Sequence, residues 1–305
     1  MAANTPGWAR STVFYGSSDP AGYYDQIIGD KLVTYLEQEA FASVLIGDSA
    51  HRAIGGVGEG AYGAYRAALK HPGVFSAIAA TDGPLDFDGV DGNSGLIPLF
   101  QQSLNEQGLT AATYRNFDSS IAWPISRMFV GGALAFSPHI TQVADSFTFT
   151  DNGRRTWLKI VDTIPDVTTL ITRCVQGQGL GSIMINPGVG NIDWDFHLPF
   201  DSLGQVYHPI WDNYWMPNNL ENMYQAAPTS LNNMKLWFAT SQQAEYGFFG
   251  QTQSWITTLK NNGLTGNMTE MRYTGYSGAA TTNNKYLYDV MRDMLIFYSN
   301  SFGAN

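Results

Sequence analysis

The 305-residue sequence predicts an α/β protein in which a mostly parallel sheet carries helices on both faces. Two observations lead to this prediction. Short apolar runs that are typical of buried strands alternate along the chain with longer segments whose apolar residues recur at helical spacing. A glycine-rich turn, residues 55–63, joins the first of these strands directly to a helix. Because strands that alternate with helices are joined by right-handed crossovers, the strands are expected to be parallel.

The first half of the chain supplies the strand–turn–helix unit. A helix is expected over Tyr23–Gln38, where apolar residues recur every three or four positions and would place one face on the sheet. The apolar run Ala53–Val57 predicts a short buried strand, and Gly60–Lys70 predicts a helix that His71-Pro72 ends. Val74–Ala80 is the next expected strand, and Ser11–Tyr15 has the composition of a further one.

The second half resumes the alternation after a long interruption. Strands are expected at Met234–Thr240 and Met268–Tyr273, and helices at Thr252–Lys260 and Lys285–Tyr298. Residues 88–230 lose this rhythm and contain scattered Gly, Asn, Asp and Trp between short apolar runs. We therefore expect one domain, residues 1–305, with a large loop-rich, lid-like insertion at 88–230.

Composition argues against nucleic-acid binding, membrane binding and a disulfide-stabilised fold. A net charge of −10 and an isoelectric point near 4.8 disfavour binding to nucleic acid or to anionic membranes. No run of about 18 apolar residues exists to span a bilayer. The single cysteine, Cys174, excludes an intramolecular disulfide framework. Few charged residues and abundant Asn, Thr and aromatics favour an extracellular or cell-surface protein, although no secretory signal is recognised in the first residues of the sequence.

The glycine-rich turn carries a family resemblance. Residues 52–64 read RAIGGVGEGAYGA, and residues 65–87 continue as YRAALKHPGVFSAIAATDGPLDF. This text resembles that of the esterase D and enterochelin-esterase-like α/β-hydrolases, which reads roughly RAIAGHSMGGYGALRLALKHPDLFGAV…SGPLDF. The resemblance implies an α/β-hydrolase-like fold with a nucleophile elbow, a strained G-x-S-x-G turn between strand and helix. The position of the nucleophilic serine is occupied by Gly58.

The resemblance also locates the other two members of the catalytic triad. The family places its acid in a pattern like CGTRDEYG and its base in a pattern like DGHMG, and the matching text here is residues 240–247, TSQQAEYG, and residues 273–278, YTGYSG. Ala244 then stands at the carboxylate position and Tyr276 at the imidazole position. Acyl transfer needs a nucleophile, a base and a group that orients the base. The resemblance therefore implies a hydrolase fold without its triad.

Neighbouring polar residues offer substitutes for the lost groups. Glu59 follows the nucleophile position and Glu245 follows the acid position. Successive side chains point in different directions, which favours solvated or helix-capping carboxylates over a rebuilt acid–base pair. His71 lies at a helix end before Pro72, where a contact with the helix dipole is favourable. Three histidines of the insertion show no metal-ligand spacing: His139, His197 and His208.

Two further clusters have an alternative chemistry. Asp86, Asp88 and Asp91 alternate around glycines as Ca²⁺ ligands do, but the spacing and the closing glutamate of a calcium loop are missing, so a polar turn is favoured. No cofactor is predicted. An aromatic-rich set is expected mainly to pack in the core or lid, with a sugar-stacking or protein-contact surface as the alternative. Its members are Trp194, Tyr207, Trp211, Tyr214, Trp215 and Trp237.

The resemblance leaves an open sheet edge. The resemblance implies roughly three or four strands before the helix expected at Tyr23, and the residues that precede Tyr23 in this sequence are expected to form one, Ser11–Tyr15. We expect an N-terminally shortened sheet whose edge pairs with another copy or with a second polypeptide. The leading hypothesis is a catalytically inactive, esterase-like protein with a structural, assembly or binding role. An active carboxylic-ester hydrolase with a non-standard site and a carbohydrate-binding protein using the old pocket are the alternatives.

Overall fold

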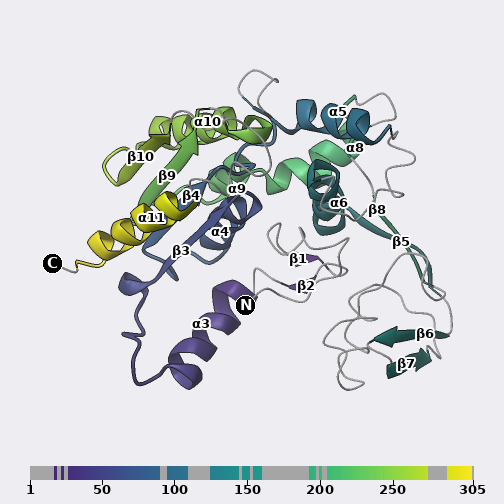
Figure 1. Ribbon diagram of the computed structural model, residues 1–305, viewed down its shortest axis with the longest axis horizontal. Helices are drawn as coiled ribbons and strands as arrows, with labels where there is room; N and C mark the ends of the chain where they lie inside the picture. Colours follow the sequence, from purple (N-terminus) through teal and green to yellow (C-terminus); the bar gives the residue numbers. More distant parts are fainter. Residues whose placement is uncertain are drawn as a thin grey trace.

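A four-stranded parallel sheet forms the centre of the molecule (Figure 1). The computed structural model describes residues 17–18, 22–23, 27–89, 95–108, 124–143, 146–151, 154–159, 192–196, 199–200, 205–242, 244–273 and 287–303. The strand order is β10–β9–β4–β3, and every neighbouring pair is parallel. The strands are β3 (Ala53–Val57), β4 (Ala77–Thr81), β9 (Lys235–Ser241) and β10 (Met268–Tyr273).

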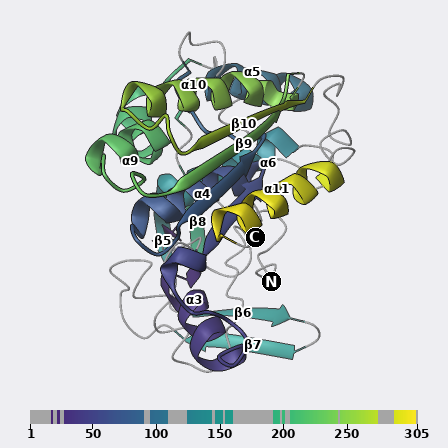
Figure 2. The same cartoon turned by 90° about the vertical axis from the view of Figure 1, so that its left-hand side faces the viewer.

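Helices cover both faces of the sheet, as the sequence predicts (Figure 2). Side chains alternate along each strand, so Ile78 and Phe238 point to one face while Ala79 and Trp237 point to the other. The first face packs against α4, α9 and α10, and the Tyr65 ring of α4 stacks on Phe238 with centroids 5.6 Å apart. The second face packs against α11. The helices are α4 (Glu59–Lys70), α9 (Leu220–Ala226), α10 (Phe248–Asn261) and α11 (Leu287–Ser301).

The predicted strands and helices of the sheet are confirmed, with shifted ends. β3 and β10 have the predicted bounds. β4 begins at Ala77 instead of Val74, because the chain is still in the turn after α4, where the Val74 N–H donates to the His71 carbonyl. β9 lies one residue later than predicted, and α10 begins four residues earlier, directly after the left-handed Gly247. The predicted strand Ser11–Tyr15 lies outside the described residues.

The segment before β3 differs from its prediction. Tyr23 belongs to β2 (Gly22–Tyr23), which pairs antiparallel with β1 (Ser17–Ser18), so the expected helix cannot begin there. A helical segment occupies residues 27–40 instead, hereafter the α3 segment. It comprises η2 (Ile27–Lys31), α3 (Leu32–Tyr35) and η3 (Leu36–Ala40).

The range 88–230 contributes helices to the core as well as strand pairs. Phe100 of α5 and Phe129 of α6 pack edge to face, and Phe136 of α6 packs against Tyr62 of α4 and against Trp215. The helices are α5 (Leu96–Gln107), α6 (Pro124–Phe136), α8 (His208–Ile210), η6 (Trp211–Trp215) and η7 (Met216–Asn218). The antiparallel pairs are β5 (Pro138–Val143) with β8 (Ile192–Phe196), and β6 (Ser146–Asp151) with β7 (Arg154–Lys159). Two short helices complete the description, η4 (Ser49–His51) and η8 (Glu245–Gly247).

Candidate functional site

The turn between β3 and α4 has the geometry of a nucleophile elbow. Gly58 alone separates Val57 of β3 from Glu59 of α4, with φ 61° and ψ −128°. Its N–H donates to the carbonyl of Thr81 at the end of β4, at 2.8 Å. This backbone conformation strongly favours glycine, so the strand–turn–helix unit predicted from the sequence is confirmed.

Close packing around the elbow explains two of the other glycines. A Cβ on Gly56 would lie 2.1 Å from the backbone of Gly60, and a Cβ on Gly83 would lie 2.4 Å from the Gly58 carbonyl oxygen. At Gly58 itself the nearest atom to an added Cβ is the Asp82 carbonyl oxygen, at 3.9 Å. The turn therefore has room for a side chain at Gly58, the position where the sequence resemblance places a nucleophilic serine.

The other predicted site residues are only partly described. Glu59 is half-buried in the first turn of α4, where a carboxylate interacts favourably with the helix dipole. Ala244 is half-buried and packs against the core just after β9, with its N–H donating to the Ser241 carbonyl at 2.9 Å. Glu245 opens η8, and Tyr276 lies outside the described residues. Since β3, β4 and β9 are parallel, Gly58 and Ala244 follow strands that end at the same edge of the sheet.

A carboxylate that sequence reasoning missed lies at this carboxyl edge. Asp82 follows the last residue of β4 and is 1% exposed. Its Oδ1 accepts a hydrogen bond from Thr240 Oγ1 at 2.7 Å and another from the Ser241 N–H at 3.2 Å. Its Oδ2 is buried and has no hydrogen-bond partner among the described residues. Its φ is +44°, in the left-handed region that residues other than glycine, Asn and Asp rarely adopt.

This environment gives Asp82 an unusual acidity. Burial disfavours its charged form and raises its pKa from 3.8 to about 6, against the opposing effect of the hydrogen bonds from Thr240 and Ser241. A carboxyl group with a pKa near 6 exchanges protons readily at neutral pH, which is a property of general acids and bases. The sequence signal that could have identified it is an Asp directly after a buried strand, at the edge where α/β proteins bind ligands.

Of the three calcium candidates, the structure describes Asp86 and Asp88. Asp86 is buried and accepts hydrogen bonds from Ser254, from Asn219 at 3.4 Å and from the Asp88 N–H at 3.2 Å, the last of which closes the polar turn. Asp88 is exposed, and Asp91 lies outside the described residues. The pKa of Asp88 is raised by desolvation and by the negative charges of Asp86 and Asp212. Within the described part of the chain, no group of three His, Cys, Asp or Glu residues could hold a metal ion.

The aromatic residues of the second half divide between core and surface. Trp211, Trp215 and Trp237 are buried, as expected for core packing, while Tyr207 and Tyr214 are about half exposed. The side chain of Trp194 lies outside the described ones. Among the described side chains of this set, the two tyrosines are the ones exposed enough to stack on a ligand without rearrangement, as the sugar-stacking alternative requires.

The histidines have ordinary structural positions. His71 is the C-cap of α4, and its ring lies so close to Gly29 that a Cβ there would overlap it. His208 contacts the carboxylate of Asp212 on the surface at 3.2 Å. The side chains of His139 and His197 lie outside the described ones.

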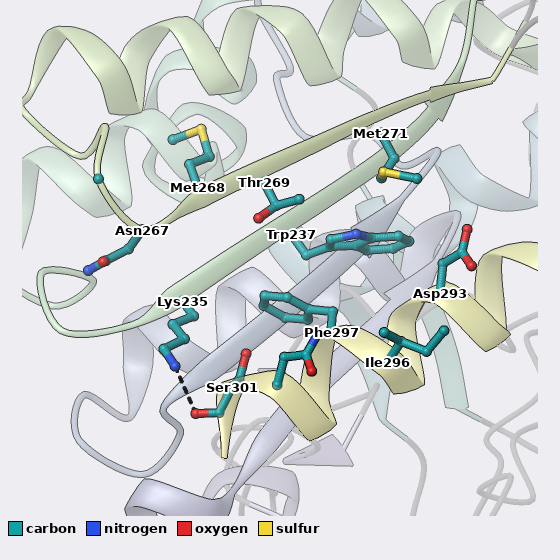
Figure 3. Close-up of a pocket in the computed structure, with 12 residues that line it drawn as sticks. Lys235, Trp237, Asn267, Met268, Thr269, Met271, Asp293, Ile296, Phe297 and Ser301 are labelled. Carbon is teal, nitrogen blue, oxygen red and sulfur yellow. Dashed lines mark hydrogen bonds between the residues drawn. The ribbon is translucent and has the colours of Figure 1, made fainter. Parts of the chain in front are cut away.

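A separate pocket of about 520 Å³ lies between α11 and the beginning of strands β9 and β10 (Figure 3). The Trp237 and Phe297 rings stack with centroids 6.3 Å apart, and Met271 lies over the indole. At one end, Lys235 Nζ donates to the Ser301 carbonyl at 2.9 Å. Because Lys235 is the first residue of β9, the pocket lies toward the amino ends of the strands, away from Gly58 and Asp82.

Comparisons with known proteins return similarity of fold only. No protein-family model matches the sequence, and no curated protein matches it. A ferulic acid esterase aligns over 94% of this chain at 13% identity, with a TM-score of 0.42, and the chain spans 65% of that protein's length. MPT51 of Mycobacterium tuberculosis aligns over 96% of this chain and 73% of its own length at 11% identity, with a TM-score of 0.45. The α/β hydrolase GrgF of a Penicillium species aligns over 92% and 72%, at 11% identity and a TM-score of 0.39.

The described part of the chain contains no helix that is both long and apolar enough to cross a lipid bilayer.

Proposed function

We propose that this protein is a non-catalytic, esterase-like protein that acts by binding or assembly. The observation that carries the proposal is Gly58, which occupies the nucleophile position of a preserved elbow and leaves that position without a side chain. A preserved backbone without a reacting group cannot form an acyl-enzyme intermediate at that position. Ala244 at the expected acid position points in the same direction.

The binding role is proposed to use the free edge of the sheet. β3 ends the strand order and has no second neighbour among the described strands. Soluble proteins normally cover such an edge, because its unpaired backbone groups template pairing with another chain. Another copy or a second polypeptide would pair there, and the composition of the chain favours an extracellular or surface setting for it.

A second candidate function rests on Asp82. A buried carboxyl group with a pKa of about 6, beside the elbow, is suited to general acid–base catalysis. It favours the alternative of an active carboxylic-ester hydrolase with a non-standard site, in which Asp82 activates a water molecule directly.

Ester hydrolysis distinguishes the two candidates. The purified protein is incubated with p-nitrophenyl acetate between pH 5 and pH 8, beside Asp82→Asn and Gly58→Ser variants. The non-catalytic proposal expects background rates from all three proteins, because serine alone lacks a base. Hydrolysis that follows the titration of a group near pH 6 and disappears in Asp82→Asn would refute the proposal and establish the alternative.

A further inference from the structure

The outer edge of β3 has no pairing partner among the described strands. Along β3, the Gly58 N–H and the Arg52 carbonyl both bond to the β4 side, at Thr81 and Ser76. Because backbone groups alternate between the two edges of a strand, those of Ala53, Gly55 and Val57 point away from β4. No described strand pairs with that side. The backbone N–H and C=O groups of these three residues are therefore directed to the outer side of β3, where another strand could pair with them.

An apolar groove of about 790 Å³ runs along this part of the molecule. One wall is β3, with Ile54, and the other is the α3 segment, with Leu32 and Leu36. The loop that joins them adds Val44 and Ile46, which are 72% and 69% exposed. Apolar residues this exposed in a row are uncommon on a free surface and mark a binding site.

The α3 segment faces β3 across this groove, since Leu32 and Leu36 line it together with Ile54. Figure 1 shows the segment next to β3, and its first part, η2, contacts α4. Its apolar residues Ile28, Leu32 and Leu36 recur on one face, yet none of the three is buried more than partly. An apolar helical face beside a strand edge that has no described neighbour leaves room for a further strand, which would pair with β3 and pack on that face.

The charges beside the groove indicate the kind of strand. Its charged lining consists of Glu37, Asp48 and Arg52, and Glu37 already pairs with Arg52. Asp48 accepts a hydrogen bond from the His51 N–H and lies 2.7 Å from His51 Nδ1, and this hydrogen bonding lowers its pKa, so both acidic groups of the lining are charged and already have a partner. The chain as a whole carries a net charge of −10, which opposes the approach of a second copy and favours a basic partner.

We propose that the groove beside β3 binds an extended apolar β-strand flanked by basic residues, supplied by a different polypeptide. The strand pairs with the outer backbone groups of β3 and buries its apolar side chains against the α3 segment. This inference rests on the proposed binding function and names its partner. β-Strand addition of this kind takes affinity from main-chain hydrogen bonds and selectivity from side-chain pockets.

A synthetic peptide tests the proposal directly. The probe has alternating valine and threonine residues with two lysines at each end, and its binding to the full chain is measured by fluorescence anisotropy. One control peptide carries N-methyl groups on the backbone of its valines, and a second has glutamates in place of the lysines. We expect at least about tenfold weaker binding of the methylated peptide, because it cannot form the main-chain hydrogen bonds. The glutamate-flanked peptide should also bind several-fold more weakly.

Protein variants locate the binding site. A Val44→Glu, Ile46→Glu double variant changes exposed side chains and should fold normally, but it should weaken peptide binding about tenfold or more. The matched control is Tyr207→Glu with Tyr214→Glu, which changes two exposed aromatics at the other side of the molecule and should leave binding unchanged. Hydrogen exchange at the Gly55 amide should be fast in the free protein and slow with the peptide.

Three results would overturn the inference. They are absence of binding by the folded protein, equal binding of the methylated peptide, and self-association that protects the Gly55 amide without any peptide. The first result would mean that the groove does not bind such a strand. The second would mean that binding does not use main-chain pairing, and the third would mean that the groove binds a second copy of this chain. Ester hydrolysis by a preparation that binds the peptide would refute the non-catalytic proposal alone, whereas inactivity together with absence of binding would refute only the groove.

Discussion

Replacing Asp82 by Asn should stabilise the protein at neutral pH. The folded-state pKa of Asp82 is about 6, above its ordinary value of 3.8, because the carboxyl group is buried. Below pH 3.8 the group is protonated in both states and its contribution to stability is complete. As the pH rises toward 6, the unfolded chain loses its proton first, so the folded state loses stability. Asparagine has nearly the same shape as the neutral acid, tolerates the left-handed φ and keeps an oxygen for Thr240 and Ser241.

The magnitude follows from the two pKa values. The interval between 3.8 and about 6, at about 1.4 kcal/mol per pH unit, corresponds to roughly 3 kcal/mol. Relative to the parent protein, Asp82→Asn should therefore change the free energy of unfolding little at pH 4 and raise it by up to about 3 kcal/mol at pH 7. The assay is urea denaturation followed by tryptophan fluorescence at half-unit pH intervals. Asp30→Asn, an exposed acid, is the matched control and should change stability by about 0.5 kcal/mol or less at every pH.

The opposite result would refute this reasoning. If Asp82→Asn lowers the free energy of unfolding by the same amount at pH 4 and at pH 7, the carboxylate does not titrate between these values. Its hydrogen bonds with Thr240 and Ser241 would then outweigh its burial, and Asp82 would be a structural link between β4 and β9.

Other substitutions near the carboxyl edge have equally definite expectations. Thr240→Val removes the hydroxyl that donates to Asp82, so the free energy of unfolding should fall by about 1.5–3 kcal/mol at pH 7 in urea denaturation. Thr81→Val removes a buried hydroxyl that has no partner among the described residues, so the same measurement should show no change or a gain of about 1 kcal/mol. Gly58→Ala should fold but lose about 1–3 kcal/mol by the same assay, because alanine is strained at this φ and ψ although space is available. Gly56→Ala should lower the melting temperature more than Gly58→Ala does, because the new Cβ at residue 56 would lie 2.1 Å from the Gly60 backbone. Equal melting temperatures of the two variants would contradict the packing argument.

The elbow could be predicted from the sequence because its determinants are local. Val57, Gly58 and Glu59 are consecutive, and the glycines that fix the turn lie within a few residues of it. The same holds for β10, whose predicted bounds come from a continuous stretch of six residues. Local propensity and side-chain periodicity are sufficient wherever tertiary contacts reinforce them.

The acidity of Asp82 could not be predicted in this way. Its hydrogen-bond donors, Thr240 and Ser241, are 158 and 159 residues away in sequence, and they reach it only because β4 and β9 are neighbours in the sheet. The groove beside β3 has the same origin, since its walls come from the α3 segment, the following loop and the end of the chain at Phe302. The helix expected from Tyr23 was misplaced because strand pairing with Ser17 competes with helical periodicity over those residues.

Gly58 and Asp82 together separate the two candidate functions more sharply than either does alone. Gly58 relieves backbone strain at the elbow, whereas Asp82 adds a left-handed φ and a buried carboxyl group, and its carbonyl oxygen would lie 3.9 Å from a Cβ on Gly58. Groups that act in function are often costly to stability, because activity can require a strained or destabilised site. If Asp82→Asn gains stability and leaves peptide binding at β3 unchanged, the carboxylate is not needed for assembly, and its use must be sought in a ligand at the carboxyl edge. If the substitution weakens peptide binding as well, the two edges are coupled through β4, the strand that links Asp82 to β3.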